Sequence, residues 1–220
     1  MKPLEDCRLY TFVDAAYLNG RAPELVAQQL CDGGSDLIQL RAKLSSPDEI
    51  RRMAEAVVPI TKRAGVGLVI NDYPEIAREI GAEFSHLGQE DFFDAGYKHV
   101  RELKIKGDAP SIPKIGLSSH APDQAQRAVG AGADYIAIGP VYATGTKPGR
   151  MPVTLEYVRW AAEHVTVPWF AIGGINLKNV HEVLAAGTRR ICVVSAILNA
   201  LDVTATCVEF RRTLESFGAG

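Results

Sequence analysis

Two short apolar segments of the sequence each lead directly into a carboxylate. The run GVGLVI is followed by Asn71 and Asp72, and the run FSHLG continues through Gln89 to Asp91. Carboxylate oxygens are ligands that Mg²⁺ prefers in proteins, where this ion usually also keeps water and phosphate oxygens. Asp72 could instead cap the helix expected from Pro74 onward, or pair with a nearby cation. If a phosphorylated ligand lies close by, the two aspartates predict a magnesium site.

Cationic residues that could hold such a ligand follow another apolar segment. Gln39, Arg41 and Lys43 are spaced i, i+2, i+4, so in a strand their side chains point the same way. A half-buried arginine requires an anionic partner. Lys147, in the segment GPVYATGTK, is expected to join them. A solvated loop is the alternative for Lys43 alone, but the group predicts a diphosphate site.

A second anion site is expected where AIGGIN and CVVSAI come together. Gly173 and Gly174 allow close approach of the backbone, and a helix beginning near Ser195 adds a favourable dipole. A plain glycine turn is the alternative. His120 is the histidine nearest these polar residues, as an acid or base or as a structural hydrogen-bonding group. No Ser-His-Asp, Cys-His or Schiff-base lysine arrangement is evident.

The elements that must position these residues alternate along the chain. Short apolar segments predict strands, and amphipathic segments between them predict helices, which indicates βαβ units and a parallel sheet. The strands are apolar on both faces, as in a sheet covered by helices. The predicted strands span 9–14, 36–41, 67–71, 84–88, 114–118, 135–139, 169–173 and 190–195. Helices are predicted between them, including one over 92–104 and one over the C-terminal 196–217.

Eight such units predict an α/β fold of the (β/α)8 TIM-barrel class, as a single domain over residues 1–220. A doubly wound open sheet is the second possibility. In a TIM barrel the carboxyl ends of the strands carry the active site, and the polar residues described above all follow strands.

Composition excludes several classes of function. The 220 residues are 47% hydrophobic and 23% charged, with a formal net charge of -2, so no global field attracts nucleic acid or a membrane surface. No apolar run approaches the ~20 residues of a membrane span. The four cysteines are far apart and suggest neither a zinc site nor disulfides. We expect a cytoplasmic enzyme with small-molecule substrates, and the sequence is compatible with a homo-oligomer.

The ordered motifs QLRAK, IND, HLGQED, GLSSH, GPVYATGTK, AIGGI and VVSAI resemble those of the thiamine-phosphate synthase family over nearly the whole chain. The resemblance implies a transferase that joins a hydroxymethylpyrimidine diphosphate to a thiazole phosphate and releases pyrophosphate. It also implies Mg²⁺ at Asp72 and Asp91. The C–O bond to the diphosphate would break largely before the thiazole nitrogen attacks.

The resemblance assigns expected roles to further residues. The pyrimidine diphosphate would be held by Gln39, Leu40, Arg41, Ala42, Lys43, Asn71, Ser118 and Lys147. The thiazole phosphate would be held by Thr144, Gly145, Thr146, Gly174, Val194 and Ser195. Catalytic roles would belong to Arg41, Lys43, Lys147 and Ser118.

The sequence departs from the family pattern near two of these motifs. Tyr73 stands where arginine is common, Ala143 where proline is common, and 148–150 where an acidic residue is common. These changes bear on loop closure and substrate affinity. Three other functions compete: a thiazole tautomerase, a non-catalytic sensor of thiamine phosphates, and another phosphate-binding barrel such as a sugar-phosphate isomerase or aldolase.

Overall fold

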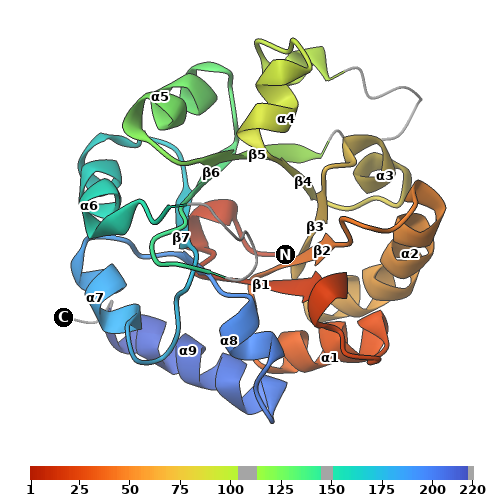
Figure 1. Ribbon diagram of the computed structural model, residues 1–220. Helices are drawn as coiled ribbons and strands as arrows, with labels where there is room; N and C mark the ends of the chain where they lie inside the picture. Colours follow the sequence, from red (N-terminus) through yellow and green to blue (C-terminus); the bar gives the residue numbers. More distant parts are fainter. Residues whose placement is uncertain (104–112, 145–150, 218–220) are drawn as a thin grey trace.

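Eight parallel strands form a closed barrel in chain order, with β8 paired back to β1 (Figure 1). The computed structural model describes residues 1–103, 113–144 and 151–217. The strands are β1 Leu9–Asp14, β2 Leu37–Arg41, β3 Gly67–Asn71, β4 Phe84–Leu87, β5 Lys114–Ser119, β6 Tyr135–Ile138, β7 Trp169–Ile172 and β8 Ile191–Cys192. The barrel expected from the sequence is confirmed, and the open sheet is excluded because both edges are paired.

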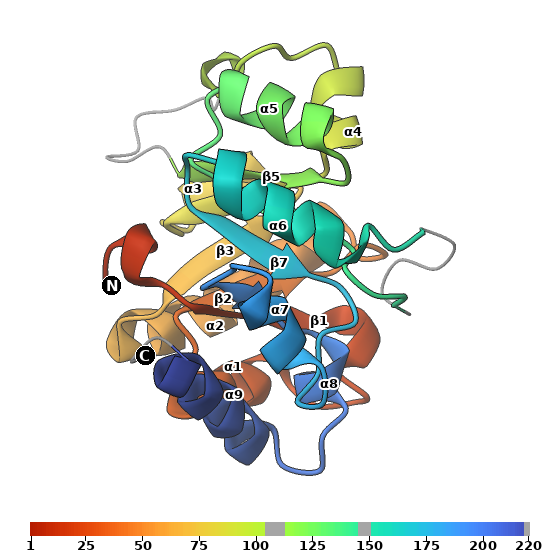
Figure 2. The ribbon, with the colours of Figure 1, turned by 90° about the vertical axis from the view of Figure 1, so that its left-hand side faces the viewer.

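Helices surround the barrel on its outer side (Figures 1 and 2). The α-helices are α1 Pro23–Asp32, α2 Pro47–Ala64, α3 Pro74–Glu79, α4 Gln89–Asp94, α5 Pro122–Gly130, α6 Thr154–His164, α7 Val180–Ala185, α8 Ser195–Leu198 and α9 Val203–Phe217. Short 3-10 turns are η1 Leu4–Asp6, η2 Ala15–Tyr17 and η3 Val100–Glu102. Within the described ranges, no helix is both long and apolar enough to cross a bilayer.

Helix α2 shows how local sequence sets an element. Ser46 accepts a hydrogen bond from the Glu49 amide while the Glu49 carboxylate accepts from the Ser46 amide, which completes a capping box. Pro47 occupies the first turn, and Gly65 ends the helix with φ of 67°. Residues 46–49 and Gly65 therefore fix the two ends of α2.

Three predicted boundaries are wrong. The helix expected over 92–104 is the shorter α4, followed by a turn at Gly96 with φ of 88° and then η3. The single C-terminal helix is two helices, because the Asp202 carboxylate accepts the Ala205 amide and restarts the chain as α9. The strand expected over 190–195 keeps only two residues, since Ser195 already begins α8.

Aromatic rings fill the barrel interior below the mouth. Tyr10, Phe84, Tyr135 and Phe170 are fully buried and meet edge to face, with centroid separations of 5.3–6.2 Å. Gly116 makes room for one of them, because a Cβ there would lie 2.1 Å from Cζ of Tyr135. The barrel interior is thus a packed core.

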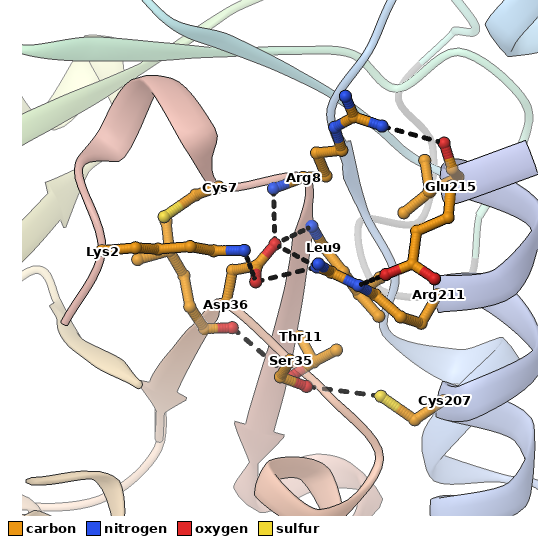
Figure 3. A network of polar contacts seen from close by, with 12 residues as sticks. Lys2, Cys7, Arg8, Leu9, Thr11, Ser35, Asp36, Cys207, Arg211 and Glu215 are labelled. Carbon is orange, nitrogen blue, oxygen red and sulfur yellow. Dashed lines mark hydrogen bonds and ion pairs between the residues drawn. The ribbon is translucent and has the colours of Figure 1, made fainter. Parts of the chain in front are cut away.

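At the opposite end of the barrel, the buried carboxylate of Asp36 contacts several separate segments of the chain (Figure 3). Asp36 accepts the backbone amides of Arg8 and Leu9 at 2.5 and 3.0 Å. It also pairs with Lys2 at 2.5 Å and with Arg211 of α9 at 2.8 Å. Asp36 therefore connects the starts of β1 and β2 to the last helix.

Candidate active site

A cavity of about 360 Å³ lies at the carboxyl ends of the strands. Its walls come from β1 to β8 and the loops that follow them, so residues distant in sequence face one space. Among the residues expected at the site, those that line it are Gln39, Arg41, Lys43, Asn71, Asp72, Asp91, Ser118, Thr144, Gly174, Val194 and Ser195.

The alternation of β2 decides which of its residues reach the cavity. Gln39, Arg41 and Lys43 line the cavity, as their spacing predicted. Leu40 and Ala42 have side chains buried in the apolar core, 1% and 5% exposed, and do not line it. The side-chain contact with the pyrimidine diphosphate expected for these two residues is not supported.

Gln39 is held at the floor of the cavity by the Tyr10 hydroxyl, which in turn contacts the Tyr135 hydroxyl. Its Nε2 donates to the Tyr10 hydroxyl at 2.5 Å, and that hydroxyl lies 3.2 Å from the Tyr135 hydroxyl. Burial raises the pKa of Tyr10 and of Tyr135 well above the ordinary tyrosine value, so both phenols stay protonated. The fixed amide leaves the Gln39 carbonyl oxygen available to a ligand donor.

Arg41 has an anionic partner that the sequence did not reveal. Its Nη1 lies 2.8 Å from Oδ2 of Asp14, whose side chain is 1% exposed. The two residues are opposite each other because β1 and β2 pair Asp14 with Arg41. Asp14 also accepts the Ala16 amide at 3.0 Å. The Asp14 carboxylate thus fixes the position of the Arg41 guanidinium group.

Asp72 does not cap the helix that follows it. The N-cap of α3 is Tyr73, which makes no side-chain capping bond. Asp72 has φ of 66°, a left-handed conformation that aspartate tolerates better than most residues, and its amide donates to the His86 carbonyl at 2.8 Å. The capping alternative is therefore excluded, and the carboxylate is directed into the cavity.

Asp72 and Asp91 converge on the Lys43 ammonium group. Its Nζ lies 2.5 Å from Oδ2 of Asp72 and 3.9 Å from Oδ2 of Asp91. Asp91 reaches this position from the first turn of α4, and Gly88 allows it because a Cβ there would lie 2.4 Å from the Asp91 carboxylate. The two aspartates therefore lie close together, and Lys43 forms the ion pair that was the alternative to a metal site.

The carboxylates also fit a hard divalent ion. Within the part of the chain that the structure describes, the buried Oδ1 of Asp72 has no hydrogen-bond partner. No set of three or more His, Cys, Asp or Glu side chains is grouped for a metal among those residues. A site with two carboxylates would be completed by phosphate oxygens and water, which is the usual coordination of Mg²⁺.

Ser118 and His86 form the wall beside the aspartates. The Ser118 hydroxyl lies 3.5 Å from Nε2 of His86 and 3.4 Å from the Leu87 carbonyl. His86, which the motif analysis did not place at the site, is buried and lines the cavity. Its position one residue before the end of β4 is the signal that could have identified it.

His120 is anchored by its ring nitrogen. Nδ1 contacts the carbonyl oxygen of Gly139, so this nitrogen carries the proton and donates. Nε2 lies 3.9 Å from the carboxylate of Glu90, which also lines the cavity. The contact of Nδ1 with Gly139 has a structural role, because it holds the loop after β6. The contact of Nε2 with Glu90 places Nε2 in the cavity wall.

The expected monophosphate site is only partly described. Gly173 and Gly174 have φ of 106° and 66°, and a Cβ on Gly174 would lie 2.7 Å from Tyr142. Gly174, Val194 and Ser195 line the cavity, as does Thr144. Gly145, Thr146 and Lys147, and the departures at 148–150, lie outside the described residues.

A comparison with protein-family profiles assigns the chain to a family. Residues 9–197 match the profile of the family described as thiamine monophosphate synthase. The chain belongs to this family. The chain is 36% identical to the thiamine-phosphate synthase of Halalkalibacterium halodurans, over 99% of this chain and 100% of that protein. It is 42% identical to that of Thermobifida fusca, over 99% and 97% respectively.

A solved member of the thiamine monophosphate synthase family has the same fold. The thiamine phosphate pyrophosphorylase of Pyrococcus furiosus superimposes with a TM-score of 0.79 at 25% identity, covering 97% of this chain and 98% of that one. The family resemblance seen in the motifs is therefore confirmed over almost the full length.

Proposed function

We propose that this protein is a thiamine-phosphate synthase. It condenses 4-amino-2-methyl-5-hydroxymethylpyrimidine diphosphate with 4-methyl-5-(2-phosphoethyl)thiazole to give thiamine phosphate and pyrophosphate. The observation that carries this proposal is the convergence of Arg41, Lys43, Asp72 and Asp91 on one cavity in a chain of this family. In the reaction, the C–O bond to the diphosphate breaks and the thiazole nitrogen donates its electron pair to form a C–N bond.

Departure of pyrophosphate requires groups that accept its growing negative charge. Arg41 is oriented by Asp14, and Lys43 supplies an ammonium group whose side chain is 42% exposed and able to move. Hydrogen-bond donors aimed at a developing anion lower the barrier more than a general base would. Ser118 and Asn71 add neutral hydrogen-bonding groups on the same wall. We assign these residues to the pyrimidine diphosphate, together with Lys147.

The floor of the cavity suits the pyrimidine ring. Phe12 and Tyr10 stack with centroids 5.3 Å apart and present apolar surface, while the Gln39 carbonyl oxygen can accept a hydrogen bond from the pyrimidine amino group. Thr144, Gly174, Val194 and Ser195 are assigned to the thiazole phosphate, with Gly145 and Thr146. Holding both substrates in one cavity contributes orientation, worth roughly 7–11 kcal/mol in the best cases.

Asp72 and Asp91 are the residues that would hold Mg²⁺. When bound, the ion would neutralise charge on the diphosphate oxygens. For this to occur, the Lys43 ammonium must leave the position between the carboxylates and turn toward the phosphate oxygens.

The test is a coupled measurement of both products. With both substrates and Mg²⁺, we expect equal amounts of thiamine phosphate and pyrophosphate, and no product after removal of divalent ions by a chelator. Asp91→Ala should lower kcat/KM by at least about a hundredfold, since one metal ligand is lost. Asp94→Ala is the matched control, because Asp94 is an exposed carboxylate on the same helix α4 that does not line the cavity.

Three outcomes would contradict the proposal. Full activity of Asp91→Ala would refute the metal assignment. Isomerisation of the thiazole carboxylate without the pyrimidine, and without pyrophosphate release, would indicate the tautomerase instead. A protein that binds thiamine phosphate tightly but forms no product would be the non-catalytic sensor.

A further inference from the structure

Four arginines surround a second cavity at the end of the barrel opposite the mouth. The cavity is about 580 Å³, and we call it the basal arginine pocket, formed by Arg8, Arg189, Arg190 and Arg211. Arg8 precedes β1, Arg190 precedes β8, and Arg211 lies on α9. Figure 2 shows the N-terminus at this end, while the arrow of β7 points away from it. None of these residues lines the active-site cavity.

Within the described ranges, one of the four guanidinium groups forms ion pairs with carboxylates. Arg211 pairs with Asp36 at 2.8 Å and with Glu215 at 2.7 Å (Figure 3). Arg8 donates to the Leu214 carbonyl at 3.1 Å instead. Among the described residues, no ion pair within 4.0 Å reaches Arg8, Arg189 or Arg190. Three guanidinium groups therefore line the pocket without an ion pair in that part of the chain, although the carboxylates of Glu5, Asp6 and Glu215 line it as well.

Arg190 has hydrogen-bonding capacity that the described residues leave unused. Its Nη2 donates to the Glu5 carbonyl at 2.5 Å, but its Nε is buried and has no hydrogen-bond partner in the described ranges. Burial lowers the pKa of Arg190, the Glu5 carboxylate raises it, and the charges of Arg8 and Arg189 lower it further. A ligand anion in the pocket would reduce the repulsion between the arginines, and Arg189, which is exposed, could donate to it.

We propose that the basal arginine pocket binds a single phosphate group, as inorganic phosphate or a phosphate monoester. Guanidinium groups match phosphate oxygens with paired, charge-assisted hydrogen bonds. Glu5 and Asp6 also line the pocket and are exposed. Their carboxylates would repel a longer, more highly charged polyphosphate, which limits the ligand to one phosphate group. This proposal is independent of the reaction proposed for the mouth.

Calorimetric titration of the whole protein with inorganic phosphate, and separately with ethyl phosphate, tests the proposal. We expect saturable binding that weakens as salt rises, because opposite charges are screened. Arg189→Gln should weaken it about tenfold through loss of a charge-assisted contact. Arg189 is exposed, so this variant should fold, whereas Arg190→Gln also loses the contact with Glu5. Arg212→Gln, at an exposed arginine outside the pocket, should bind as the unaltered protein does.

Crystals soaked in tungstate, a heavy phosphate analogue, locate the site independently of the titration. Anomalous density between Arg189 and Arg190, together with the titration result, would support the proposal. Density only at the barrel mouth, or equal phosphate affinity of Arg189→Gln and the unaltered protein, would overturn it. Equal binding of the two ligands would indicate recognition of phosphate itself, and preference for ethyl phosphate would indicate a monoester.

Discussion

At the scale of single residues, two Asp–Arg pairs of nearly equal length have different surroundings. Arg41 and Asp14 are 2.8 Å apart beside the active-site cavity, with side chains 14% and 1% exposed. Arg51 and Asp48 are 2.7 Å apart on α2, with side chains 32% and 80% exposed. Exposed pairs contribute little to stability, because water solvates the separated charges nearly as well. A pair with a buried carboxylate leaves an uncompensated charge when it is broken.

We therefore expect Asp14→Ala to lower the free energy of unfolding by about 3 kcal/mol, since it removes the partner of Arg41 and the acceptor of the Ala16 amide. Asp48→Ala should change it by at most about 1 kcal/mol. Denaturant unfolding measures both. Equal losses in the two variants would mean that Asp14 has no special role in holding Arg41.

At the scale of elements, glycine in a strand decides how the barrel is filled. Gly116 of β5 lies against the ring of Tyr135 from the neighbouring β6, and a Cβ would come 2.1 Å from that ring. Gly130, at the end of α5, has no atom within 4 Å of an added Cβ. The same substitution thus tests packing at one position and helix propensity at the other.

Gly116→Ala should lower the free energy of unfolding by about 2 kcal/mol or more, because the ring must move within a packed interior. Gly130→Ala should leave it unchanged or raise it by up to about 1 kcal/mol, since alanine favours a helix. Thermal and denaturant unfolding of both variants provide the measurement. A stability of Gly116→Ala equal to that of the unaltered protein would show that the interior has room to spare.

At the scale of the whole molecule, buried thiols link folding to alkaline pH. Burial raises the pKa of Cys7 from 9.0 to about 11 and that of Cys31 from 9.0 to about 11. A folded-state pKa above the unfolded value favours the native state fully below the unfolded pKa. This contribution is lost as pH rises from about 9 toward 11.

We expect the melting temperature to fall between about pH 9 and pH 11, and the fall to be shallower in Cys31→Ala, which removes one of these groups. The thiols should also react slowly with a disulfide reagent at about pH 8, because the reactive thiolate is scarce. Melting curves against pH and the rate of thiol modification check this. An identical slope in Cys31→Ala would assign the alkaline loss to other groups.

The order of the strands, the preference for a barrel over an open sheet, and the shared direction of Gln39, Arg41 and Lys43 were all predictable from the sequence. These features follow from local periodicity, capping residues and side-chain alternation, which act over a few neighbouring residues. The sequence also predicted that Asp72 and Asp91 would meet, because strand ends gather at one face of a barrel.

Which charged side chains form ion pairs depends on the tertiary structure. Asp14 meets Arg41 through the register of β1 with β2, and Lys43 lies between Asp72 and Asp91 through the left-handed turn at Asp72. His86 lines the cavity because side chains alternate along the buried strand β4. Register and turn conformation depend on pairing between distant segments, and hydrophobic periodicity within a single segment does not encode that pairing.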